Sequence, residues 1–322
     1  MALTDLSKTL IALILAAPLG AVFAQGSYPN RPLRIVAAEP GGGGDLIARL
    51  IAHELAASLG QQVIVENRGG ASGMIAANTV AKASADGHTL LFYSGFVWTL
   101  PLMKSVPYDP VKDFIPITLT ARAPNILVVN PALAAKSVKD LIALAKAKPN
   151  ELSYASSGSG GTPHLAAELF KSMAGVTLVH VPYKGQAQAL SDLIGGQIQV
   201  MFPNAASVAP HIKAGRVRAL AVTTPEPSVL APGLPTVASA GLPGYESVVM
   251  FGAFVPAKTP GAIVERLHRE IVNAVRNPDV KEKLFNTGAE AVGTTSSEFA
   301  ALIKSDMARL GKVIREAGIR AD

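Results

Sequence analysis

The chain of 322 residues contains no cysteine, which excludes disulfide bonds, thiolate chemistry and cysteine-ligated metal centres. Aromatic residues make up only 5% of it, with a single tryptophan, and charged residues only 16%. Beyond residue 24 no uninterrupted apolar run reaches the length of about 18 residues that suggests a transmembrane helix. Hydrophobic residues make up 49%, so the sequence predicts a globular protein large enough for two domains.

The first 24 residues resemble a secretory signal peptide. Lys8 gives a weakly positive start, an apolar run covers 10–17, and Val22 and Ala24 place small residues at positions −3 and −1 of a cleavage site. We expect cleavage after Ala24 and export of a soluble chain. An N-terminal membrane anchor is the alternative, but the apolar run is shorter than the ~20 residues that a span requires.

The net charge of +6 is scattered over predicted helices. Nucleic-acid binding would require a basic face with interleaved aromatic residues, so no nucleic-acid partner is expected. A mild positive field helps to collect anionic ligands.

Two glycine-rich loops each follow a predicted strand and precede a predicted helix. The first spans 40–45 and the second 156–162. Glycine lets backbone N–H groups approach a ligand, and the helix N-terminus adds free donors and a positive dipole end. Each loop is a candidate anion site, and the pair predicts a small carboxylate held from two sides.

Strand and helix patterns alternate along the chain, which predicts an α/β architecture with mostly parallel sheets. Strands are predicted at 33–38, 63–66, 89–93, 117–119, 126–129, 152–155, 178–181, 199–202, 217–222 and 248–255. Such sheets bind ligands at the carboxyl ends of their strands, where both glycine loops and a predicted loop over 94–100 lie.

Capping residues and proline mark the ends of several elements. Ser137 is expected to cap one helix, and Thr162 another with Pro163 at its first helical position. The segment 224–245 is rich in proline and glycine, which predicts a connection between two lobes.

A series of short motifs runs through the chain in order. They are Tyr28-Pro-x-Arg-Pro32, Pro40-Gly-Gly-Gly-Gly-Asp45, Val65-Glu-Asn-Arg68, Ala85-Asp-Gly-His-Thr-Leu-Leu91, Val106-Pro-Tyr-Asp-Pro-Val-Lys-Asp-Phe114, Tyr154-Ala-Ser-Ser-Gly158, His180-Val-Pro-Tyr-Lys-Gly185, His211-Ile-Lys-Ala-Gly215 and Ala240-Gly-Leu-Pro-Gly-Tyr245. Each motif alone is weak, but the ordered series resembles the tripartite tricarboxylate transporter substrate-binding proteins, also called the Bug or TctC family. The resemblance covers 28–319, essentially the whole mature chain.

The resemblance implies a periplasmic solute-binding protein with a two-lobe, type II-like periplasmic binding protein fold. Its lobes would be 25–124 plus 246–322 and 125–245, with hinge crossings near 122–125 and 244–248. It implies a monomer that captures a small organic acid anion and delivers it to membrane transporter subunits. It implies no enzymatic activity and no cofactor. No metal site is expected either, because the six histidines form no metal-binding pattern.

The candidate ligand-binding residues belong to the glycine loops and to neighbouring strand ends. They are Glu39, Gly41, Gly42, Gly43, Ser94, Phe96, Trp98, Ser157, Gly158, Ser159, Gly160, Thr162, His164, Lys184, Phe202 and Asn204. Backbone N–H groups of the glycines, with the hydroxyls of Ser157 and Thr162, are expected to hold the carboxylate directly or through water.

Three departures from the family pattern bear on the ligand. Glu39 stands where an apolar residue or proline is usual, and Pro203 stands where an aspartate is usual, which removes a partner for a ligand ammonium. Phe96 and Trp98 make the loop over 94–98 unusually aromatic. The sequence therefore predicts an aromatic mono- or dicarboxylate rather than citrate-like acids or aspartate. The alternative is that both rings belong to the core.

Two other functions stay open. A sensory protein that presents a carboxylate to a receptor kinase would share these features. A periplasmic hydrolase could use Ser157 or Ser159 with His164, but the sequence lacks a Gly-x-Ser-x-Gly elbow and an evident acid partner. Nucleotide binding is disfavoured because the first loop lacks the Gly-Lys-Ser/Thr ending of a P-loop.

Overall fold

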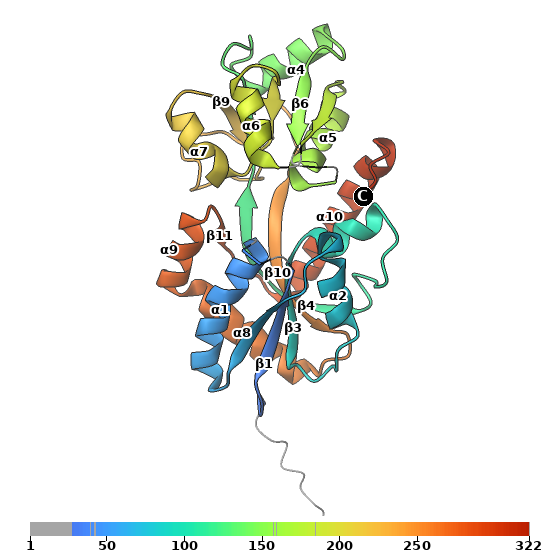
Figure 1. Ribbon diagram of the computed structural model, residues 1–322, viewed down its shortest axis with the longest axis vertical. Coiled ribbons are helices and arrows are strands. Elements are labelled where there is room, and N and C mark those ends of the chain that lie inside the picture. Colours follow the sequence, from blue (N-terminus) through green and yellow to red (C-terminus); the bar gives the residue numbers. More distant parts are fainter. Residues whose placement is uncertain are drawn as a thin grey trace, which may run out of the picture.

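The computed structural model describes residues 28–321 apart from residues 39, 42, 157, 159 and 184. The signal peptide predicted over 1–24 lies outside the described residues. So do five predicted site residues, which are Glu39, Gly42, Ser157, Ser159 and Lys184. The described part forms two lobes, one above the other in Figure 1, and each lobe is built on its own sheet.

The first lobe contains a six-stranded sheet in the order β11-β4-β10-β3-β1-β2. Its strands are β1 Leu33–Ala37, β2 Val63–Asn67, β3 Thr89–Ser94, β4 Phe114–Pro124, β10 Val248–Pro256 and β11 Glu290–Ala291. One face is covered by α1 Gly43–Leu59, α8 Gly261–Arg276 and α9 Pro278–Asn286. The other is covered by α2 Met74–Ala81, the short α3 Phe96–Thr99 and α10 Ser296–Glu316. Two 3₁₀ turns, η1 Ala71–Gly73 and η2 Leu100–Leu102, flank α2 and α3.

The second lobe contains a five-stranded sheet in the order β7-β6-β8-β5-β9. Its strands are β5 Ile126–Val129, β6 Ser153–Ser156, β7 Val179–Pro182, β8 Val200–Met201 and β9 Arg218–Val222. The helices α4 Val138–Ala147 and α5 Thr162–Ala174 cover one face. The helices α6 Gln186–Ile194 and α7 Ala205–Lys213 cover the other.

Helix α1 illustrates how the sequence produces these layers. Ile47, Ile51 and Leu55 recur every four residues, so they share one face of the helix, and all three are buried against the first sheet. Its first turn therefore stands at the carboxyl end of β1, where the first glycine loop enters the helix.

Both sheets are mixed, so the expectation of mostly parallel sheets is wrong. Of the nine pairings among the described strands, five are antiparallel and four are parallel. The reason in the first lobe is β10, the strand by which the chain returns from the second lobe. It runs opposite to both β3 and β4, between which it lies.

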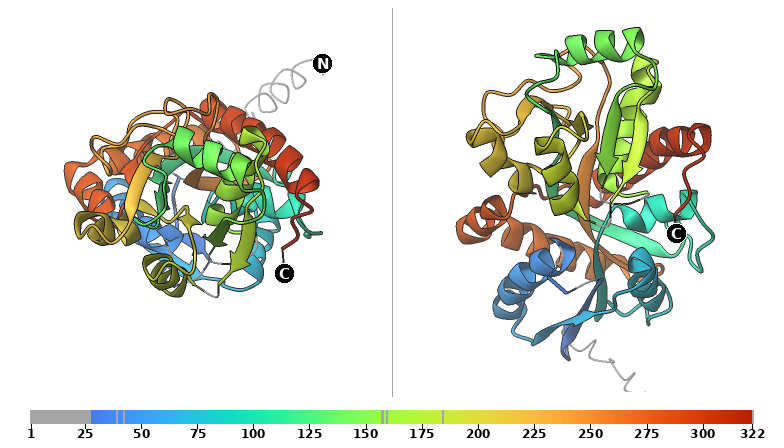
Figure 2. Two further views of the ribbon diagram at one scale, coloured as in Figure 1. Left: turned by 90° about the horizontal axis from the view of Figure 1, so that it is seen from above. Right: turned by 45° about the horizontal axis from the view of Figure 1, so that its top comes forward.

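The chain crosses between the lobes twice, from β4 to β5 and again just before β10. The segment 224–245 is not itself the crossing, because Val237, Leu242 and Tyr245 are buried in the second lobe's core. Helix α10 also links the lobes, by packing against both of them. In Figures 1 and 2 α10 lies beside α5 as well as beside the first sheet, and its residue Val313 belongs to the second lobe's core.

Candidate functional site

A cleft between the lobes consists of two adjoining cavities of about 510 and 800 Å³. Gln186, Asn204 and Phe251 line both cavities. The first turns of α1, α5, α6 and α7 all line the cleft. Because a helix N-terminus presents free N–H groups and a positive dipole end, this convergence favours an anionic ligand.

The first glycine loop is fixed by a buried carboxylate. The Gly41 N–H donates to Asp45 Oδ2 at 2.8 Å, and Gly41 has a φ of +74°, which glycine adopts without strain. Asp45 also accepts from Asn67 Nδ2 at 2.9 Å and pairs with Arg49 at 3.0 Å. Burial alone would raise the pKa of Asp45, but the hydrogen bonds from Gly41, Arg49 and Asn67 together hold that pKa below its usual value.

The second glycine loop has the same construction with a different acceptor. The Gly160 N–H donates to His164 Nδ1 at 2.9 Å, and Gly160 has a φ of +77°. At the start of the loop Ser156 Oγ contacts His180 Nε2 at 2.7 Å and accepts from the Gly158 N–H at 3.3 Å. Side chains below each loop therefore hold its turn in place.

Phe251 of β10 lies where the two cavities adjoin. It lines both of them, and the backbone of Gly43 packs against its ring. A Cβ atom on Gly43 would lie 2.7 Å from Phe251 Cζ, so only glycine fits there with the ring in place. Phe96 lines the smaller cavity as a second aromatic wall.

The model of the tripartite tricarboxylate transporter family receptor, TctC, matches residues 47–319 of this chain. The chain belongs to the TctC family. Protein BugT of Bordetella pertussis is 36% identical over 99% of both chains.

Two similar proteins of known structure hold a small carboxylic acid. The structure of Rpa4515 from R. palustris with adipate is 38% identical, with a TM-score of 0.74 over 91% of this chain and 99% of that one. MatC from Rhodopseudomonas palustris with bound malate is 30% identical, with a TM-score of 0.71 over 89% of this chain and 100% of that one. The fold is thus that of a two-lobe periplasmic solute-binding protein of the TctC family, as the sequence motifs predict.

Several predicted site residues line the cleft of this TctC-family chain. They are Gly41 and Gly43 in the larger cavity, Ser94, Phe96, Gly158 and Thr162 in the smaller one, and Asn204 in both. Gly160 lines a small pocket of about 40 Å³ that continues the cleft towards α10.

Trp98 does not line the cleft, so the prediction that it stacks on the ligand is wrong. The expected loop over 94–100 folds into α3 and η2, and the Trp98 ring is fully buried between Phe254 and Phe299. Its Nε1–H donates to Asp306 Oδ2 at 2.7 Å, which satisfies the indole inside the lobe.

Phe202 is also a core residue rather than a cleft residue. It is fully buried and packs against Phe170 of α5 at a ring distance of 5.8 Å. Asn204, two residues later, is the residue at this strand end that reaches the cleft.

His164 lies below the second loop, and only 6% of it is exposed, so its predicted role as a direct ligand contact is not supported. The N–H groups of Gly158 and Gly160 are likewise engaged inside the loop rather than free for a ligand. The N-cap of α5 is Gly161 rather than Thr162, which leaves Thr162 in the first turn facing both the small pocket and the smaller cavity.

Sequence reasoning missed Gln186 and left Phe251 outside the predicted set. Gln186 opens α6 directly after Gly185, close behind β7, so the rule that found the two glycine loops could have found it. Phe251 lies within β10, and its antiparallel pairing with Ser94 at the carboxyl end of β3 places it beside the cleft.

A hydrolytic site is not favoured by this geometry. Ser156 and His180 form a hydroxyl–imidazole contact, but Ser156 is fully buried and its hydroxyl is bonded to Gly158. Within the described ranges, no three His, Asp or Glu side chains come together in a way that could hold a metal ion. None of the helices that the structure describes is long and apolar enough to cross a membrane.

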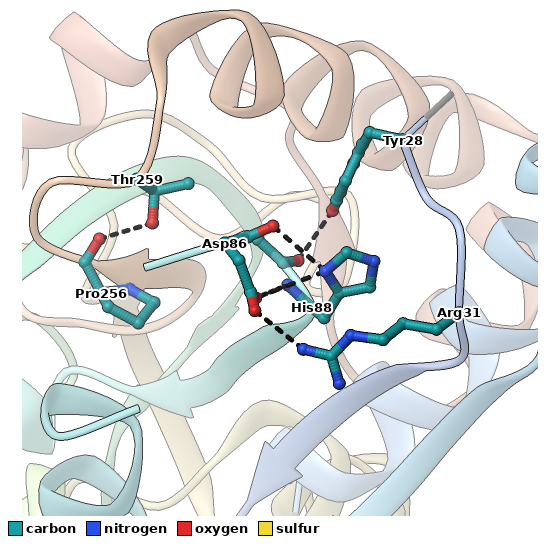
Figure 3. A network of polar contacts seen from close by, with 7 residues as sticks. Tyr28, Arg31, Asp86, His88, Pro256 and Thr259 are labelled. Carbon is teal, nitrogen blue, oxygen red and sulfur yellow. Dashed lines mark hydrogen bonds and ion pairs between the residues drawn. The ribbon is translucent and has the colours of Figure 1, made fainter. Parts of the chain in front are cut away.

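Residues from two of the family motifs form a polar network with one another (Figure 3). Tyr28 donates to the Gly87 carbonyl at 2.7 Å, and Arg31 pairs with Asp86 at 2.7 Å. These residues precede β1 and β3, so they lie at the opposite end of the first sheet from the first glycine loop. Their role is to tie the start of the described chain to the first lobe.

Proposed function

We propose that this TctC-family protein captures a small organic carboxylate in the periplasm and delivers it to the membrane subunits of a tripartite tricarboxylate-type transporter. The observation that carries the proposal is the convergence of four helix N-termini on one cleft between two lobes. Among the described residues that line the two large cavities there is no Lys, Arg, Asp or Glu. Among these described residues, the groups available to a carboxylate are therefore mainly helix N-termini, hydroxyls and amides.

We propose further that the preferred ligand has an aromatic body. Phe96 and Phe251 present rings to the smaller cavity, beside the hydroxyls of Ser94 and Thr162. Stacking on such rings contributes roughly 0.5–1.5 kcal/mol per pair beyond burial. Adipate and malate, which two structural relatives hold, are the aliphatic competitors.

The test is a ligand panel measured with the mature protein. Thermal shift followed by calorimetry would compare benzoate, terephthalate, adipate, malate, citrate and glutamate at pH 7. We expect tight binding of at least one carboxylate, with the aromatic acids ahead and glutamate last. Tight binding of adipate or malate alone would overturn the aromatic preference, and binding of none would overturn carboxylate capture.

A transport role and a sensory role predict different effects of deleting the gene. Deletion of the gene should abolish uptake of the radiolabelled ligand, whereas a sensory role predicts normal uptake and altered gene expression. We propose no catalytic activity, so ester substrates should not be turned over. We also propose a monomer, for which light scattering should give the mass of one chain.

A further inference from the structure

The two glycine loops share one hydrogen-bond design. In each, the glycine two residues before the helix donates its N–H to the side chain of the third helical residue. The pairs are Gly41 with Asp45 at 2.8 Å and Gly160 with His164 at 2.9 Å. Both glycines have left-handed φ angles, so the same backbone conformation that favours glycine occurs in both turns.

The acceptors differ in what protonation does to them. A carboxylate accepts whenever it is ionised, and Asp45 is kept ionised by Arg49 and Asn67. An imidazole nitrogen accepts only while it carries no proton. Because His164 Nδ1 accepts the Gly160 N–H, the structure fixes the neutral tautomer with its hydrogen on Nε2.

The groups around His164 give little support to an imidazolium. Its ring stacks on His180 at 4.0 Å, and the Tyr154 ring lies 4.8 Å from that of His180 and 6.3 Å from that of His164. The nearest carboxylate is Glu168, 3.9 Å from His164 Nε2, and Glu168 already accepts from the Tyr154 hydroxyl and pairs with Lys171 at 2.6 Å.

Burial is the largest influence on His164 and lowers its pKa. His180 and Lys171 lower it further while Glu168 opposes them, so the pKa of His164 falls to about 4. Above about pH 5 the ring therefore stays neutral, and the loop keeps its acceptor.

We propose that His164 is a positioning residue for the ligand, whose neutral Nδ1 holds the Gly160 N–H and whose protonation releases the second glycine loop and weakens ligand binding. The inference rests on the proposed function, because it places the ligand at this loop. His180 supports the other end of the loop through Ser156. Of the two loops, only the one in the second lobe uses an imidazole as its acceptor, so we expect the acid sensitivity of binding to arise there.

The experiment compares wild type with His164→Asn, because asparagine Oδ1 can stand near the place of Nδ1 and accepts at every pH. Calorimetry would give the Kd of adipate and of terephthalate from pH 6 to pH 3.5. If the loop binds ligand only when His164 is neutral, the affinity of the wild type should fall between pH 6 and pH 3.5 by about fourfold more than that of the variant. Titration of the ligand and of Asp45 affects both proteins equally and cancels in the comparison.

His164→Leu removes the acceptor and should weaken binding at every pH, while retained affinity in His164→Asn excludes a general packing defect. A second readout needs no ligand. The Gly160 amide resonance of the whole protein should titrate with an apparent pKa of about 4 in wild type and stay constant in His164→Asn.

If neither acid binds wild type at pH 7, the proposed function fails for these ligands, and the amide titration still decides the loop mechanism. If wild type binds and its pH profile coincides with that of His164→Asn, or if His164→Leu binds as tightly as wild type, the inference is overturned.

Discussion

Gly43 and Phe251 meet at the floor of the cleft, where a Cβ atom on Gly43 would approach Phe251 Cζ to 2.7 Å. This contact joins the start of α1 to β10, the strand that returns from the second lobe. It explains why a glycine-rich segment continues into the helix itself.

Gly43→Ala should push the Phe251 ring into the cavities that it lines. Overpacking of this kind costs roughly 1–3 kcal/mol, so we expect the Kd of a bound carboxylate to rise about tenfold or more. The control is Gly261→Ala, the same change at the first residue of α8, where no atom lies within 4 Å of the added methyl. Calorimetry on both variants checks the prediction, and equal affinities would show that the ring moves without consequence.

Asp45→Asn should destabilise the protein in a way that depends on pH. The folded-state pKa of Asp45 is lowered, so its contribution is present above the unfolded-state pKa of about 4 and is lost as pH falls through the folded-state value. We expect about 1–3 kcal/mol lower free energy of unfolding at pH 7, because three partly buried hydrogen bonds lose a charged acceptor.

Urea unfolding of wild type and Asp45→Asn at pH 7 and pH 3 measures this difference. The difference in unfolding free energy between the two proteins should be smaller at pH 3 than at pH 7. Asp140→Asn on the exposed start of α4 is the control and should change stability less. A gap of constant size would mean that the Asp45 charge does not act through the loop.

Asp306 should determine the environment of the only tryptophan. Trp98 Nε1–H and Arg309 both donate to Asp306, so Asp306→Leu leaves a buried indole N–H without its acceptor. We expect a loss of roughly 1–3 kcal/mol in unfolding free energy and a shifted Trp98 emission. In wild type, iodide should quench Trp98 little because its ring is fully buried. Strong iodide quenching would contradict the buried position.

The α/β class and both glycine loops are predictable from the sequence because they depend on local patterns. Strand, glycine and helix N-terminus follow one another within a few residues, as in the segment from β1 through Gly41 to α1. Ser137 is a similar case, since its Oγ accepts from the Asp140 N–H at 3.1 Å as the capping rule predicts.

The position of Trp98 depends on distant partners and could not be read from its neighbours. Its acceptor, Asp306, lies 208 residues further along the chain, and Phe254 and Phe299 come from two other elements. An aromatic residue after a strand fits a ligand wall and a core equally well. The direction of β10 is unpredictable for the same reason, since pairing with both β3 and β4 follows from tertiary packing.

Export should remove the first 24 residues. The observation is the short apolar run over 10–17 followed by Val22 and Ala24 at the −3 and −1 positions. The intact mass of protein recovered from a bacterial periplasm should correspond to a chain that begins at Gln25. Replacement of Ala24 with a bulky residue, as in Ala24→Trp, should retain the precursor. A full-length chain beginning at Met1 in the membrane fraction would falsify the cleavage.

Ligand binding should hold the two lobes together on the α9 side of the cleft, where this structure already has them in contact. On the other side α10 already packs against both lobes, through Leu310 and Ile314 against Leu165. On the α9 side Gly288 of the first lobe abuts Ala206 of the second, and a Cβ atom on Gly288 would overlap Ala206. We propose that the lobes, with boundaries at 124/125 and 245/246, pivot on the α10 side, separate at Gly288 when no ligand is bound, and return to this contact when ligand binds.

Gly288→Ala should therefore hold the lobes apart and weaken binding. Gly60→Ala is the matched control, because Gly60 also has a left-handed φ but no atom within 4 Å of an added Cβ. Solution scattering with saturating terephthalate or adipate should show a smaller radius of gyration in wild type and in Gly60→Ala, and a smaller decrease in Gly288→Ala. Both variants place alanine at a left-handed φ, so the main difference between them is the steric block between Gly288 and Ala206. An equal decrease in all three proteins would place the closing contact elsewhere in the cleft.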